Sequence, residues 1–144
     1  MDVCRARPLV AGGVGMPCRS PAVVVAGLAS CSQSAPGPDQ TAQDFLRALG
    51  AKDTAAACSV VAFDGQPLSG DDVLLCRTGY DTLVNEVIPA DQLAQLRSAT
   101  VTGVSVDGDT ATIPDGQIPA DLAAYLGDIG LVRVNQRWYV NTEP

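Results

Sequence analysis

The spacing of apolar residues changes once along this chain of 144 residues, and that change constrains the fold more than any other feature. From Thr41 to Ala99 the apolar residues recur every three or four positions, which is the pattern of amphipathic helices. After Ala99 they alternate with polar residues, as in half-buried strands. Helices followed by antiparallel strands predict an α+β domain, with N-terminal helices packed on a curved antiparallel sheet.

The first predicted helix begins at Thr41, which can act as its N-cap, and ends at Gly50. Asp53 can cap a second helix over 54–61 after a tight turn, so we expect a helical hairpin. The apolar positions of the first helix follow the spacing i, i+3, i+4 and i+7, and they are Ala42, Phe45, Leu46 and Leu49.

Residues 64–70 have the composition of a loop. A third helical segment is expected to open at Asp71 or Asp72, with an interruption near Gly79. Pro89 is placed to begin another short helix. The helical half of the domain therefore contains four short segments.

Two hairpins are predicted in the second half of the chain. Their turns are at 107–109 and 135–137, and a helical turn over 119–126 lies between them. The expected strands are 101–106, 110–113, 131–134 and 138–140.

The N-terminal segment has the features of an export signal. Arg5, Arg7 and Arg19 precede an uncharged run from Ser20 to Ser30. That run is too short for a transmembrane helix, which needs about 20 apolar residues, whereas about 7 to 15 suit a secretory signal. We therefore expect a cleaved signal peptide at 1–30, and Arg19 and the apolar run remain if Met16 is the true start.

Leu28-Ala29-Ser30-Cys31 resembles the bacterial lipobox, whose cysteine is diacylated and becomes the new N-terminus. The residues that follow, 31–40, are rich in Pro, Gly and Ser and are predicted to form a flexible tether before a domain at 41–144. We expect an exported lipoprotein, held on the extracytoplasmic face of the cell membrane by palmitate-type acyl chains on Cys31. The alternatives are an ordinary cleaved signal, or a buried apolar segment with a chance cysteine.

The cysteines are consistent with export. Cys4 and Cys18 would leave with the signal peptide and Cys31 would carry the lipid, so only Cys58 and Cys76 would remain. In an oxidising compartment an even pair favours a disulfide, which would stabilise the domain by about 3 kcal/mol in the chain-entropy model. The alternative is two buried free thiols.

Charge and composition exclude several functions. From Cys31 onward six basic residues face fifteen acidic ones, a formal net charge of −9. No basic cluster is present that could bind phosphates, so nucleic acid is an unsuitable partner. The chain has no histidine, which removes histidine metal sites and histidine-based acid/base catalysis, and we expect no metal or cofactor.

From Thr41 to Thr142 the chain resembles the NTF2-like superfamily, in particular small actinobacterial-type secreted lipoproteins. Three segments carry the resemblance, namely 45–49 with the Ala-rich segment after it, the hairpin 104–111, and the closing hairpin 131–140. The resemblance implies a cone-shaped sheet that often encloses a pocket. Because this fold hosts enzymes and non-enzymes, it does not define the activity.

Two functions are compatible with this resemblance. The favoured one is a non-catalytic module that binds an envelope protein or an apolar small ligand. The alternative is an isomerase- or dehydratase-like pocket enzyme, for which the candidate groups are Tyr80, Asp81, Tyr125 and Tyr139. An apolar pocket without converging ionisable groups would favour binding, whereas a carboxylate beside tyrosine hydroxyls would favour catalysis.

Overall fold

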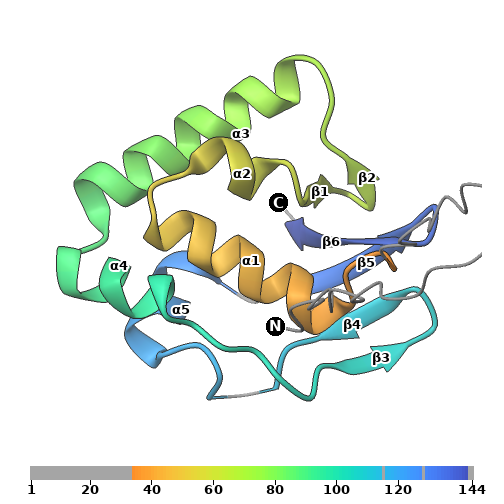
Figure 1. Cartoon of the computed structure of the whole chain (residues 1–144). Coiled ribbons are helices and arrows are strands. Elements are labelled where there is room, and N and C mark those ends of the chain that lie inside the picture. Colours follow the sequence, from red (N-terminus) through yellow and green to blue (C-terminus); the bar gives the residue numbers. More distant parts are fainter. Residues whose placement is uncertain (1–33, 115, 128, 143–144) are drawn as a thin grey trace, which may run out of the picture. The chain divides into compact units, whose positions relative to one another are not determined.

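A computed structural model describes residues 34–114, 116–127 and 129–142. The predicted signal peptide and the lipidated Cys31 lie outside these ranges. The described chain is a mixed α+β structure in which helices pack on one face of an open, curved, six-stranded sheet (Figure 1), so the predicted fold class is confirmed at this level.

Helix α1 (Pro38–Gly50) carries the predicted apolar face but begins three residues earlier than expected. Gly37 is its N-cap residue and Pro38 its first residue, a position where proline's fixed φ suits a helix and its missing N–H costs nothing. The Asp39 carboxylate accepts a hydrogen bond of 2.9 Å from the Val104 amide, which fixes the start of the helix to the loop before β3. The prediction of a flexible tether to residue 40 was therefore wrong for its last three residues.

Asp53 caps α2 (Thr54–Cys58) as predicted, accepting a hydrogen bond of 3.0 Å from the Ala56 amide. The helix is shorter than expected, because Val61 already belongs to strand β1 (Val61–Phe63). The predicted loop also contains a strand, β2 (Gln66–Pro67), which forms a hairpin with β1.

Helix α3 (Asp71–Thr82) runs through Gly79 without a break, so the predicted interruption was wrong. A single glycine weakens a helix by about 1 kcal/mol relative to alanine, which neighbouring residues can offset. The irregularity comes later, where α3 continues into a π-helical segment, η1 (Leu83–Val87).

Helix α4 (Ala90–Arg97) follows Pro89 as predicted and packs closely on the end of α1. A Cβ atom on Gly50 would lie 2.7 Å from the carbonyl oxygen of Leu93, so only glycine permits this approach. Arg97 donates a hydrogen bond of 3.2 Å to the Gly50 carbonyl, and Arg47 donates one of 2.9 Å to the Ala99 carbonyl. The two helices are thereby fixed at their crossing.

The two predicted hairpins are β3–β4 (Ser105–Asp107 and Thr110–Thr112) and β5–β6 (Gly130–Val134 and Arg137–Thr142), with α5 (Ala120–Leu126) between them. The strand order is β2-β1-β6-β5-β4-β3, antiparallel except that β1 runs parallel to β6. The first predicted strand is shorter than expected, for two reasons. The Gln117 side-chain amide hydrogen-bonds both the backbone N–H and the backbone carbonyl of Thr102. In addition, Gly103 has a φ of +69°, which is outside the range of a strand.

One continuous core lies between the helices and the sheet. Its centre is the buried face of α1, which contacts β6 on one side and α2 and α4 on the others. The largest fully buried side chains come from both layers, and they are Phe45, Leu46, Leu49, Val84, Leu96, Leu122, Leu131 and Val140.

Candidate functional site

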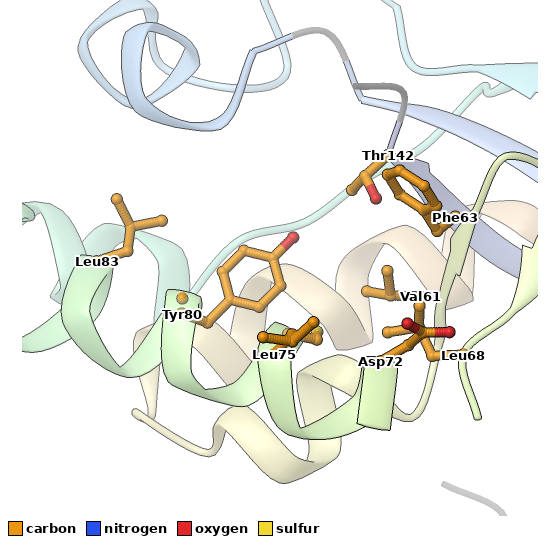
Figure 2. A pocket seen from close by; sticks show the side chains of 10 residues that line it. Val61, Phe63, Leu68, Asp72, Leu75, Tyr80, Leu83 and Thr142 are labelled. Carbon is orange, nitrogen blue, oxygen red and sulfur yellow. The ribbon is translucent and has the colours of Figure 1, made fainter. Parts of the chain in front are cut away.

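An apolar cleft of about 510 Å³ lies between helix α3 and the part of the sheet where β1 pairs with the end of β6 (Figure 2). Helix α3 does not rest on the sheet, since none of its twelve residues is buried. The cleft is lined by Val61, Phe63, Leu68, Asp72, Leu75, Cys76, Gly79, Tyr80, Leu83 and Thr142.

One face of α3 forms a complete wall of this cleft. The residues that α3 and the first turn of η1 contribute follow the spacing i, i+3, i+4, i+7, i+8 and i+11, which places them on a single side of a helix. They are Asp72, Leu75, Cys76, Gly79, Tyr80 and Leu83. The wall is therefore apolar except for a carboxylate at its start and a phenol near its end.

The opposite wall comes from the sheet. Phe63 pairs with Thr142, and Val61 pairs with Val140, so these side chains share the face that carries the helices. Phe63 is 50% exposed and Leu75, on α3, is 70% exposed. Large apolar side chains on both sides of the cleft are thus left open to solvent, and apolar surface gathered around one hollow is typical of binding sites.

The sulfur atoms of Cys58 and Cys76 lie at disulfide bonding distance, with their Cα atoms 6.1 Å apart. This pairing fits the predicted disulfide and ties α3 to the end of α2. Because Cys76 also lines the cleft, the bridge positions the wall that α3 provides.

A second, smaller cavity of about 240 Å³ adjoins the cleft. Tyr80 and Thr142 line both spaces, so these two side chains stand between them. The second cavity is also lined by Phe45, Tyr125, Leu126, Ile129, Val140 and Asn141.

Tyr80 is held in place by packing. Its ring lies edge-on to the buried ring of Phe45, with 5.7 Å between the centroids. Its hydroxyl is directed into the cleft (Figure 2). Burial raises the pKa of the Tyr80 phenol above its ordinary value of 10.0, so the group is neutral at physiological pH.

Only two of the four groups predicted for a pocket enzyme are brought together. Tyr80 and Tyr125 both line the second cavity, but Asp81 accepts a hydrogen bond of 2.7 Å from the Thr54 hydroxyl and serves to join α3 to α2. Tyr139 lies on the opposite face of the sheet from Trp138 and Val140, with the Arg137 guanidinium 5.3 Å from its ring centroid. Neither Asp81 nor Tyr139 lines the cleft or the second cavity.

The cleft contains few groups that could do chemistry. Among its described lining residues only Asp72 and Tyr80 can ionise, because the Cys76 sulfur lies at bonding distance from that of Cys58. Asp72 is exposed at the first turn of α3. Within the described ranges no cluster of three or more potential ligand residues is placed to hold a metal ion, and no helix has the length and apolar content to span a membrane.

The sequence did not predict the cleft, although part of the signal was present. Leu75, Gly79 and Leu83 recur at helical spacing, but the same pattern describes a helix that is buried on a sheet. Phe63 and Thr142 are far apart in sequence, and they meet only because β1 pairs in parallel with β6.

No protein-family model, curated protein or solved structure matches this chain.

Proposed function

We propose that this protein is an exported lipoprotein, anchored through Cys31, whose NTF2-like domain binds an apolar small molecule in the cleft between α3 and β1. The observation that carries the proposal is the cleft itself. Its volume of about 510 Å³ is within the range of small-molecule sites, which is about 300–1,000 Å³, and most of its lining side chains are apolar.

The exposed side chains indicate that the cleft receives a ligand. Phe63 and Leu75 remain at least half exposed although they face the same space. A ligand between them would bury this apolar surface, which yields about 25 cal/mol for each Å² removed from water. A protein partner would instead favour a broad apolar surface, whereas these side chains line a hollow.

Binding accounts for the cleft better than catalysis does. A pocket enzyme needs a general acid or base within hydrogen-bonding reach of the reacting group. Asp72 is exposed and lies two helical turns from Tyr80, and the Asp81 carboxylate is used in a structural hydrogen bond. The described residues therefore favour a ligand carrier or sensor over an isomerase-like or dehydratase-like enzyme.

The early start of α1 shortens the segment that would connect the domain to the lipidated Cys31. Only six residues, 32–37, separate Cys31 from Pro38, and fully extended they would span about 20 Å. Two acyl chains hold a protein stably on a bilayer. The domain would thus stay close to the surface of the membrane, which is a source of apolar molecules.

A variant that fills the cleft tests the binding function. Gly79 lines the cleft in the middle of α3, and a Cβ atom there would meet nothing within 4 Å. We expect Gly79→Phe to fold with unchanged or higher stability, since it removes a glycine from a helix, but to lose binding of the neutral apolar dye N-phenyl-1-naphthylamine.

Thr78→Phe is the matched control, because Thr78 is the neighbouring residue of α3 and does not line the cleft. It should bind the dye as the wild type does. Equal dye binding by the wild type and Gly79→Phe would show that the cleft is not the site.

The proposed lipid anchor is tested by phase partitioning in detergent. Cys31→Ala should move the protein from the detergent phase to the aqueous phase, and unchanged partitioning would exclude lipidation at Cys31.

A further inference from the structure

The two ends of the cleft have different linings. Asp72 lies at one end of the α3 wall and Tyr80 and Leu83 at the other (Figure 2). Tyr80 lies eight positions after Asp72, which corresponds to about 12 Å along the helix axis. The space between them is lined by Leu68 and Leu75, so an elongated apolar chain would lie parallel to α3.

The charge at the start of the cleft is negative. Asp72 is the carboxylate that lines it, and Asp71 lies beside it in the same turn of α3. No basic side chain lines the described cleft. The domain as a whole is acidic, so an anionic head group would be repelled and a cationic one attracted.

Near the far end of the cleft, the Tyr80 and Thr142 side chains stand between it and the second cavity. Of these two side chains the Tyr80 ring is the larger, and it is fixed against Phe45. Beyond it, that cavity has a mixed lining, with the apolar Leu126, Ile129 and Val140 on one hand and the polar Tyr125, Asn141 and Thr142 on the other. Removing the ring would therefore open the apolar cleft toward the Leu126, Ile129 and Val140 side chains of that cavity.

Resting on the proposed binding function, we infer that the ligand is a cationic amphiphile with a single alkyl chain. Its head group lies beside Asp72, its chain follows α3, and the Tyr80 ring limits the length of chain that the cleft accepts. Tyr80 is thus a specificity-determining residue, and its hydroxyl is not needed for this role.

The length limit is tested with a series of alkyltrimethylammonium ions from octyl to hexadecyl. Each is used below its critical micelle concentration, and its binding is detected by displacement of N-phenyl-1-naphthylamine. Wild-type affinity should rise by about fourfold for each added methylene that is buried, and should stop rising once the chain reaches Tyr80. In Tyr80→Leu the rise should continue to longer chains. Tyr80→Phe keeps the ring and should behave as the wild type does.

Tyr139→Leu controls for the loss of a tyrosine, because Tyr139 lies on the other face of the sheet. It should keep the wild-type length limit. Circular dichroism and thermal melting identify a variant that fails to fold, and Tyr80→Met then provides a second way to remove the ring. An identical length limit in the wild type and a folded Tyr80→Leu or Tyr80→Met would overturn the role of Tyr80.

The head group is tested separately. Decyltrimethylammonium should bind more tightly than decanol or decyl sulfate, and Asp72→Asn should weaken its binding by about two- to fivefold, as expected for an exposed ion pair. Asp71→Asn is the matched control, since Asp71 does not line the cleft, and it should change the affinity less.

The outcomes separate this inference from the function on which it rests. If the wild type binds neither the dye nor any amphiphile, the binding function itself is wrong. If it binds the dye, but decyl sulfate binds as tightly as decyltrimethylammonium or Asp72→Asn leaves the affinity unchanged, the cationic head group is wrong while the apolar site stands.

Discussion

Helices α1 and α3 are similar in length, but they contribute to this protein in opposite ways. Helix α1 buries six of its thirteen residues, whereas α3 buries none of its twelve. The apolar side chains of α1 fill the space between the sheet and α4, while Leu74 and Leu75 of α3 remain 64% and 70% exposed.

The difference follows from what holds each helix in place. Packing positions α1, including the close approach at Gly50. In contrast, α3 is attached by the Cys58–Cys76 pair, the Thr54–Asp81 hydrogen bond and the contact of Tyr80 with Phe45. A helix attached at a few points leaves its apolar face available, and this is how a small domain can keep an open apolar site.

The largest expected effect is on the packed helix. Phe45 is 1% exposed and contacts Tyr80, so Phe45→Ala should lower the free energy of unfolding by about 3–5 kcal/mol. Leu74→Ala on α3 should change it by no more than about 0.5 kcal/mol, because the Leu74 side chain is already exposed. Urea denaturation followed by circular dichroism measures both values, and similar losses would show that α3 is as firmly packed as α1.

The second effect concerns the attachment of α3. Replacing Cys58 and Cys76 together by serine should lower the free energy of unfolding by about 3 kcal/mol, since the bridge closes a loop of 18 residues. Amide hydrogen exchange should accelerate more in α3 than in α1, because α1 keeps its packing. Equal acceleration in both helices would contradict a local role for the bridge, and two alkylatable thiols in the exported protein would contradict the bridge itself.

The two helices also mark what the sequence could and could not predict. Local patterns specified α1, the Asp53 cap of α2 and the β5–β6 hairpin, because each depends on neighbouring residues. They did not specify where α1 begins, since the Gly37-Pro38 pair is equally typical of a linker. Strand β1 was missed because its partner, β6, lies almost eighty residues later in the sequence.

The candidate site was less predictable than the fold. Tyr80 and Tyr125 were singled out for possible catalysis and do line cavities, but the same reasoning selected Asp81 and Tyr139, which do not. Periodicity identifies which face of α3 is apolar, but it does not tell whether that face meets a sheet or a cleft. Only the distance between α3 and β1 decides this, and that distance depends on contacts between remote parts of the chain.

The smallest expected change in stability comes from substitutions on the exposed face of α3, and these test most directly whether that face binds a ligand. Leu74 and Leu75 are adjacent on α3 and similarly exposed, but only Leu75 lines the cleft. Leu74→Gln and Leu75→Gln should each alter the free energy of unfolding by no more than about 0.5 kcal/mol, because neither removes a buried group. Leu75→Gln should nevertheless weaken binding of N-phenyl-1-naphthylamine by roughly fivefold, the equivalent of losing about 1 kcal/mol of apolar burial under the ligand. Leu74→Gln should bind the dye as the wild type does. If both variants bind equally well, or if Leu75→Gln unfolds the domain, then α3 is a structural helix and its exposed face is not a binding wall.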